Sequence, residues 1–468
     1  MRVMLEETIP PTTSNVFTRF IQRVGVDRAI LFTLLGRFWN SIANVFSIFV
    51  ISRFLSIEEQ GYYYTFGSVI GLQVFFELGL AFVIMQSASH ERARLIWNDE
   101  GLLEGATGSR ARLASLLRLA TAWYGVISVF FALCAIPAGI YFFAAQKNIV
   151  VNISWGIPWV WLVVVTAGNL NLSPQLAFIE GCGQVAEVAF VRVLQGMIGM
   201  ACFWTALVCG LKLYSVPIMG SASLLVGVYW LFLRRGRFIK DIWCSFQRAV
   251  TINWLSEIWP FQWRIALSWL SGYFIFQLFT PVLFAFHGPA VAGRMGMSIT
   301  VTGAITTVAL AWVTTKSPTF GKFAALRQIK ALDELFFKSF RQAIWISGGF
   351  VSLLVAGIFS LNSVHFAYSE RVLQPLPFTL LSVTAFVNVI ISAEAIYLRS
   401  FREEPFLPVS LLNGALIGTS TYFLGRYSGV TEMMAGYLLI NTFVGLGMGT
   451  WILSKKRGQW HKEFSKCG

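Results

Sequence analysis

Twelve long apolar runs divide the chain, and short segments rich in glycine, proline or charged residues separate them. The runs cover 29–52, 61–86, 119–144, 155–179, 188–211, 213–233, 257–281, 291–315, 343–361, 374–398, 405–424 and 432–454. Each has roughly the 17–25 residues that an α-helix needs to cross bilayer hydrocarbon. Strands exposed to lipid are excluded because backbone polar groups there must be satisfied internally. The pattern predicts an all-α, polytopic membrane protein of about 12 transmembrane helices.

Composition and charge agree with this interpretation. The chain is 56% hydrophobic and only 12% charged, which is typical of membrane proteins. Its net charge of +14 does not indicate a nucleic-acid partner, because the basic residues gather in alternate loops. Most of the 36 Lys and Arg residues lie in one set of connecting segments and at the two termini. Because cytoplasmic segments carry such an excess, we expect both termini to be cytoplasmic.

Three basic connectors, 87–118, 234–256 and 316–342, are long and partly amphipathic. In the last, apolar residues recur at helical spacing, namely Phe323, Leu326, Ile329, Leu332, Leu335 and Phe336. Such a segment is expected to lie in the headgroup layer, where it would anchor and orient the protein.

The two halves of the chain resemble each other. Arg37 and Arg264 lie within apolar runs about half the chain apart, and residues 59–62 and 291–294 open the second and eighth runs in a similar way. Residues 165–167 recur as 383–385. This order predicts parallel repeats of six helices each. The expected organisation is an N-terminal segment (1–28), an N-lobe (29–233), a linker (234–256), a C-lobe (257–454) and a basic tail (455–468).

Polar residues form stripes on two of the predicted helices. The first run carries Arg37, Asn40, Asn44 and Ser47, and the seventh carries Arg264, Ser268 and Ser271. These spacings put each set on one face of its helix. A charge in the bilayer costs roughly 2.5–3.5 kcal/mol, so such faces usually meet a wet interior and mark a ligand path. For Asn and Ser, hydrogen bonds that hold the bundle together are an equally good explanation.

Two charged residues are predicted to lie at a similar depth in the membrane. Arg37 and Glu77 lie at similar distances from the outer ends of their helices, so an ion pair between them is one hypothesis. Gln73 shares a face with Glu77 and would line the same cavity. Arg264 has no such partner and is the better candidate for binding an anion. The alternative is that Arg264 pairs with another carboxylate, Glu257 or Glu394.

Other features narrow the class of protein. In the fourth run, Asn169–Pro174 predicts either a broken helix that exposes its backbone to substrate or a simple proline kink. The six cysteines show no paired framework, and the four histidines are scattered, so we expect neither disulfides nor a metal site. Nucleotide-binding loops, hydrolase motifs and large outer loops are absent from the sequence, which argues against an enzyme.

Several stretches resemble one family. Residues 55–64 and 74–80 look like the first hairpin of Wzx-type oligosaccharide flippases, which belong to the multidrug/oligosaccharidyl-lipid/polysaccharide (MOP) exporter superfamily. Residues 260–268 resemble the start of their second half, and residues 317–321 with 332–336 resemble the basic connector after their eighth helix. The resemblance implies a MOP-like, V-shaped bundle of two six-helix lobes around a cationic cavity.

The resemblance also implies a function. Such a protein would move a polyprenyl-diphosphate-linked oligosaccharide between the leaflets of the bacterial cytoplasmic membrane, in the outward direction. Its partners would be membrane lipids, a polysaccharide polymerase and chain-length machinery. Alternatives are a multidrug exporter of the same superfamily, which would favour an acidic cavity, and a membrane-embedded glycan polymerase, which usually needs a large outer loop.

A mechanism follows from the resemblance and the polar stripes. Arg264 and Arg37 would attract the diphosphate, and Asn40, Asn44, Gln73 and Ser268 would contact sugars. No cofactor is required, because each negative charge moved outward gains about 2.3 kcal/mol per 100 mV of membrane potential. Alternatively, Glu77 or Glu394 would couple transport to a proton or a sodium ion.

Overall fold

The computed structural model describes residues 28–145, 153–247, 251–364, 367–401 and 405–465. These residues are almost wholly helical, apart from one antiparallel hairpin of β1 (Leu95–Trp97) and β2 (Leu103–Gly105). Within these described ranges, ten helices are long and apolar enough to cross a membrane, or up to 12 when each of two bent helix pairs is one span. The prediction of an all-α, multi-pass membrane protein is confirmed.

The helices form two lobes. The N-lobe contains α2 (Arg28–Phe54), α3 (Ile57–Ile70), η1 (Gly71–Gln73), α4 (Val74–Glu77), α5 (Leu80–Arg92), α6 (Thr107–Ala144), α7 (Gly156–Gly181), α8 (Val185–Val208), η2 (Lys212–Tyr214), α9 (Ser215–Trp230), η3 (Leu231–Arg235) and α10 (Gly236–Cys244). The C-lobe contains η4 (Trp254–Ile258), α11 (Trp259–Phe276), α12 (Phe279–His287), α13 (Pro289–Thr314), α14 (Ser317–Ala325), α15 (Ile329–Ser363), η5 (Ala367–Arg371), α16 (Pro375–Arg399), α17 (Leu407–Tyr427), α18 (Val430–Ile440), η6 (Asn441–Met448) and α19 (Gly449–Ser465).

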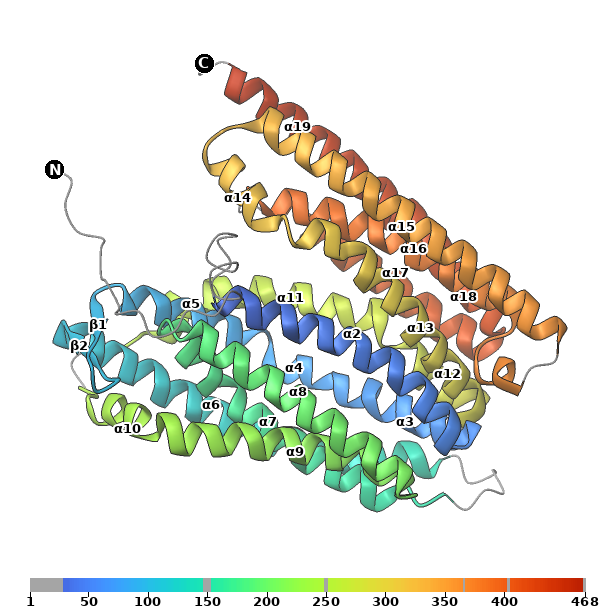
Figure 1. Ribbon diagram of the computed structural model, residues 1–468, viewed down its shortest axis with the longest axis horizontal. Helices are drawn as coiled ribbons and strands as arrows, with labels where there is room; N and C mark the ends of the chain where they lie inside the picture. Colours follow the sequence, from blue (N-terminus) through green and yellow to red (C-terminus); the bar gives the residue numbers. More distant parts are fainter. Residues whose placement is uncertain (1–27, 146–152, 248–250, 365–366, 402–404, 466–468) are drawn as a thin grey trace, which may run out of the picture.

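The two lobes are the arms of a V (Figure 1). They meet where α3 and α13 begin, which we call the α3/α13 end. They diverge toward the opposite end, where α2 begins and α19 ends, which we call the terminal end. The V-shaped bundle of two lobes expected from the sequence is therefore the observed architecture.

Glycines bring the lobes together at the α3/α13 end. A Cβ on Gly61 of α3 would lie 1.9 Å from the carbonyl oxygen of Pro289, and one on Gly293 of α13 would lie 2.8 Å from the Gly61 nitrogen. A Cβ on Gly296 would lie 2.3 Å from the Cβ of Tyr64. We call Gly61, Gly293 and Gly296 the glycine contact. It joins the two segments that the sequence identified as repeats.

Polar groups complete this contact. The Gln60 side chain is fully buried, and its Nε2 donates to the carbonyl oxygens of Gly293 (2.8 Å) and Arg371 (3.1 Å). An Nη1 of Arg371 donates to the carbonyl oxygen of Leu55 (2.7 Å). A loop before α16 in the C-lobe thereby holds the turn between α2 and α3 in the N-lobe.

Two spans predicted as single helices are bent. The second span turns by 44° between Glu77 and Leu80, where Leu78 and Gly79 have φ of 50° and 67°. These left-handed conformations end α4, and they are uncommon for a residue with a side chain such as Leu78. The seventh span turns by 43° between α11 and α12, at Gln277 and Leu278. Hydropathy carries no signal for either bend, because both sides are equally apolar.

Two expectations from the sequence need correction. The hypothesis of a broken fourth helix is wrong, because α7 runs continuously from Gly156 to Gly181 with Pro174 inside it. The basic connector does not spread its apolar face in the headgroup layer. Instead Leu332 and Phe336 of α15 are buried with Phe320 of α14 in the C-lobe core. Burial in a protein core satisfies the same amphipathic pattern as a membrane surface.

Candidate functional site

A central cavity of about 420 Å³ lies between the lobes, next to the glycine contact. Its polar lining comes from both lobes and comprises Asn44, Ser47, Tyr63, Tyr64, Ser68, Gln277, Thr280 and Thr300. Among the described residues that line it there is no Asp, Glu, Lys, Arg or His. The cavity can therefore accept a neutral, hydrogen-bonding group without help from a countercharge.

The cavity walls are fixed by hydrogen bonds. The Nε1 of Trp204 in α8 donates to the Ser47 hydroxyl (2.9 Å). Across the two lobes, the Tyr273 hydroxyl of α11 donates to the carbonyl oxygen of Ser68 in α3 (3.2 Å). These bonds set the width of the cavity on the α2 side and on the α11 side.

The polar face of α2 borders this cavity and continues beyond it. Asn44 lines the cavity, and Arg37 precedes Asn44 by seven residues on the same helix face. At 1.5 Å per residue, Arg37 lies about 10 Å closer to the terminal end. The Arg37 and Asn40 side chains are exposed, and Asn40 Oδ1 lies beside Gly196 of α8. The face bearing Arg37, Asn40 and Asn44 is therefore continuous from the diverging part of the V into the cavity.

Glu77 and Gln73 lie elsewhere than expected. Glu77 ends α4, and its Oε1 accepts long hydrogen bonds from Tyr124 of α6 (3.4 Å) and Ser173 of α7 (3.5 Å). Within the described part of the chain no ion pair joins Glu77 to Arg37. The bend at Leu78 and the packing of α4 on α6 place this carboxylate inside the N-lobe. Gln73 is half-buried in η1 and does not line the central cavity.

Ser268 of α11 also lies elsewhere than expected. Ser268 borders a small space with Arg399 of α16 and Ser410 of α17, inside the C-lobe. The face of α11 that meets the N-lobe instead carries Ile265 and Trp269, which lie against Gly79 and the bend of the second span. Ser268 therefore does not lie between the lobes as expected.

The Arg264 side chain lies outside the described residues, although its backbone belongs to α11. The carboxylates proposed as its partners have other neighbours. Glu257 pairs with Arg112 of α6. Glu394 of α16 is buried, and its Oε1 accepts a hydrogen bond from Thr450 (3.1 Å). No cluster of His, Cys, Asp and Glu suited to a metal ion occurs among the described residues.

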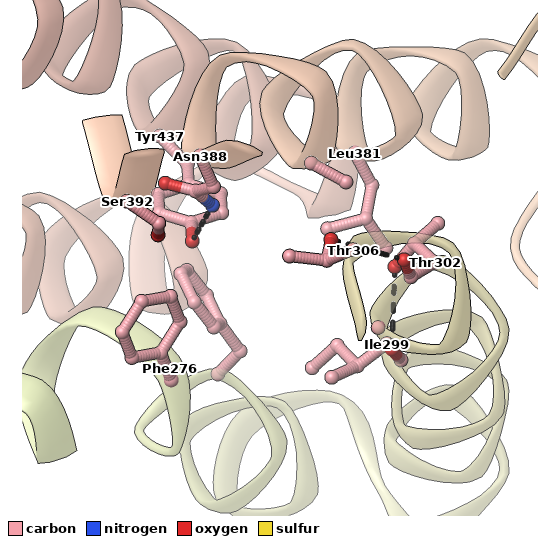
Figure 2. A pocket seen from close by; sticks show the side chains of 11 residues that line it. Phe276, Ile299, Thr302, Thr306, Leu381, Asn388, Ser392 and Tyr437 are labelled. Atoms are coloured by element: carbon pink, nitrogen blue, oxygen red, sulfur yellow. Dashed lines mark hydrogen bonds between the residues drawn. The ribbon is translucent and has the colours of Figure 1, made fainter. Parts of the chain in front are cut away.

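A second pocket, of about 190 Å³, opens inside the C-lobe between α11, α12, α13, α16 and α18 (Figure 2). Phe276 and Ile299 line both this pocket and the central cavity, so the two spaces adjoin. The polar lining consists of Thr302, Thr306, Asn388, Ser392 and Tyr437. Asn388 Nδ2 donates to the Tyr437 hydroxyl (3.1 Å). We call this space the C-lobe pocket.

The sequence contains a signal for the C-lobe pocket. Thr302 and Thr306 recur at i and i+4 on α13, and Asn388 and Ser392 do so on α16. These pairs are polar stripes on apolar helices, like the one on α2. Gln277, in contrast, lines the central cavity because the seventh span bends there, and no pattern in the sequence marks it.

An apolar groove of about 480 Å³ lies on the other side of α2. It runs between α2, α13 and α15, and its lining includes Phe49, Val301, Leu353 and Ile358. Ile48 of α2 lines both this groove and the central cavity. A polar space between the lobes thus adjoins an apolar space at their edge.

Comparison with known proteins identifies the fold. No protein-family model and no curated protein sequence matches the chain. An inward-facing multidrug resistance MATE family transporter of the MOP superfamily matches with a TM-score of 0.62 at 15% identity, covering 90% of this chain and 99% of that one. The lipid II flippase MurJ in an inward closed conformation matches with a TM-score of 0.59 at 10% identity, covering 91% and 87%.

A third match comes from Pyrococcus furiosus. It is a MOP superfamily transporter whose binding pocket has reversed polarity, suggesting a different function, and it matches with a TM-score of 0.54 at 13% identity over 93% of this chain and 95% of that one. At these identities the likeness shows the fold. The chain has the fold of MOP superfamily transporters and flippases, as the sequence resemblance implied.

Proposed function

We propose that this protein is a flippase for a polyprenyl-diphosphate-linked oligosaccharide, acting in cell-surface polysaccharide assembly at the bacterial cytoplasmic membrane. The observation that carries the proposal is the junction at Ile48, where a polar cavity adjoins an apolar groove. A lipid-linked sugar needs both spaces at once, because its headgroup must cross between the lobes while its chain stays in an apolar medium.

Arg37 supports an anionic substrate. Its guanidinium is exposed on the cavity-side face of α2, where it can form charge-assisted, bidentate hydrogen bonds with a diphosphate. Arg264 of α11 would be a second phosphate ligand. An organic cation, the typical cargo of a multidrug exporter, would favour carboxylates, and none occurs among the described residues that line the central cavity.

The transport cycle would be alternating access. In the described state the lobes touch at the α3/α13 end and diverge at the terminal end. The excess of Lys and Arg in the segments at the terminal end supports a cytoplasmic location for it. The headgroup would enter there with its diphosphate at Arg37 and its neutral sugars in the uncharged central cavity, and it would leave after the glycine contact opens. The membrane potential would supply about 2.3 kcal/mol per charge at 100 mV. A proton or sodium ion bound at Glu394 or Glu77 is the alternative source.

The test is a leaflet-accessibility assay in proteoliposomes with a fluorescent short-chain polyprenyl-diphosphate oligosaccharide. Arg37→Ala should slow crossing at least about tenfold, and Arg37→Lys should retain part of the rate because the charge remains. The matched control is Arg53→Ala, because Arg53 is an exposed arginine on the opposite face of the same helix.

Two results would overturn the proposal. Wild-type protein that moves no lipid-linked glycan under an imposed potential, but exports organic cations, would establish the drug exporter. Equal loss of transport in Arg37→Ala and Arg53→Ala would remove Arg37 from the path.

A further inference from the structure

The C-lobe pocket has a chemistry of its own. All of its lining side chains are uncharged at neutral pH. A phosphate or an ammonium group in such a site would lose its hydration without gaining a countercharge, which is costly. The occupant must therefore be neutral.

The hydrogen-bonding groups narrow the occupant further. The hydroxyls of Thr302 and Thr306 donate to the carbonyl oxygens of Ser298 (2.9 Å) and Thr302 (3.3 Å), so toward the pocket they offer acceptor lone pairs. The Tyr437 oxygen accepts from Asn388, which leaves its own O–H free to donate. Ser392 can do both. A ligand that matches this set must donate and accept at several neighbouring atoms.

Aromatic rings supply the other half of the pocket. Phe276 lies across from Asn388 and Ser392 and stands at the boundary with the central cavity (Figure 2). Phe279 also lines the pocket, with its ring centroid 4.6 Å from that of Tyr437. A pyranose ring has hydroxyls at its rim and an apolar C–H face, so it suits one polar wall and one aromatic wall. A volume of about 190 Å³ equals about six water molecules, enough for one ring and too little for a chain.

We propose that the C-lobe pocket binds one sugar residue of the transported oligosaccharide. The pocket would recognise the glycan, while Arg37 and Arg264 would bind the diphosphate. This inference rests on the proposed function and deepens it. Recognition would thus be divided between two places, with charge near the α2 face and hydroxyl groups inside the C-lobe.

The test compares two fluorescent probes on full-length protein in nanodiscs. One is a short-chain polyprenyl diphosphate that carries an oligosaccharide, and the other is the same diphosphate without sugar. Asn388→Leu should weaken binding of the glycan probe about tenfold and leave the sugar-free probe within about twofold. Thr306→Val, which keeps shape and loses only the hydroxyl, should act in the same direction by about threefold to tenfold.

The matched control is Thr307→Val. Thr307 is the next residue of α13, makes the same kind of bond to the helix backbone (3.0 Å to the Gly303 carbonyl), and is exposed outside the pocket. It should leave both affinities unchanged.

Equal weakening of both probes, or no weakening by either pocket variant, would overturn the sugar subsite. The proposed function fails separately, if wild-type protein binds the glycan probe but moves neither probe in the leaflet assay.

Discussion

The two ends of the molecule are held by opposite kinds of contact. At the α3/α13 end the lobes meet through glycines and main-chain atoms, with Arg371 bonded to a carbonyl oxygen. At the terminal end the linker after α9 is held to the N-lobe by arginines of α6. Arg110 pairs with Asp241 (2.8 Å), and Arg118 donates to the carbonyl oxygen of Trp243 (2.8 Å). A third arginine of α6, Arg112, pairs with Glu257 of η4, directly after the linker.

This difference indicates which of the two contacts opens during transport. A contact between glycines depends on close fit, so separating it leaves no buried charge without a partner. The contacts of Arg110 and Arg118 join the linker to one lobe only, so they need not break when the lobes move. The Arg112 pair reaches Glu257 of η4, at the start of the C-lobe, but it is partly exposed, so breaking it costs little. We therefore expect the α3/α13 end to open during transport, while α10 moves with the N-lobe.

The largest expected effect comes from filling the glycine contact. In Gly61→Val the new side chain would meet the Pro289 carbonyl, which cannot rotate away as a flexible side chain could. We expect the lobes to stay apart at this end and transport to fall to background. The measurement uses a cysteine placed at Thr300 in the central cavity, in a cysteine-free background. In Gly61→Val this cysteine should react with an impermeant maleimide at least about tenfold faster than in the protein with Gly61.

The control is Gly349→Val in α15. A Cβ on that glycine would have no heavy atom within 4 Å, so the substitution carries the helix-propensity cost without the collision. Faster labelling in the control as well would mean that helix propensity, and not the close approach of the lobes, produces the effect.

A smaller effect is expected from the polar part of the same contact. Arg371→Ala removes a charged hydrogen bond to Leu55, worth about 2 kcal/mol, and so should favour the open α3/α13 end by about thirtyfold. Labelling of the Thr300 cysteine reports this shift. Arg426→Ala is the control, since its bond to Tyr422 lies within α17. Unchanged labelling in Arg371→Ala would show that the glycines alone close this end.

Much of this fold was accessible from the sequence, because hydropathy and helix length decide which segments cross a membrane. The polar stripe of α2 could also be predicted from the sequence, and one of its residues, Asn44, lines the central cavity. The position of Ser268 on α11 could not be predicted, because helical periodicity does not say which neighbour a polar face meets. Here Ile265 and Trp269 face the N-lobe.

The remaining differences arise from backbone geometry. The position of Glu77 depends on the left-handed Leu78 and Gly79, and that of Gln277 on the bend of the seventh span. Neither conformation has a signal in hydropathy. The glycine contact was visible only as a weak repeat, since a sequence shows that Gly61 and Gly293 correspond but not that they touch.

The smallest expected effect concerns the arginine contacts at the terminal end. Hydrogen bonds from the Asn253 backbone N–H and from Arg112 hold the pKa of Glu257 below its ordinary value of 4.5. Because this folded-state pKa is lowered, the stabilisation is present at neutral pH and is lost as the pH falls through it. The pair is partly exposed, so its contribution should stay below about 1 kcal/mol.

Arg112→Ala should therefore lower hydrogen-exchange protection of residues 252–258 by less than about fivefold at pH 7, and by less still in acid, where the wild-type pair is also lost. Arg192→Ala removes an exposed pair with Glu180 elsewhere in the N-lobe and should leave this segment unchanged. Transport should persist in Arg112→Ala, because the pair is partly exposed and contributes little to holding η4 against α6. Faster labelling of the Thr300 cysteine in that variant would contradict the assignment of opening to the glycine contact alone.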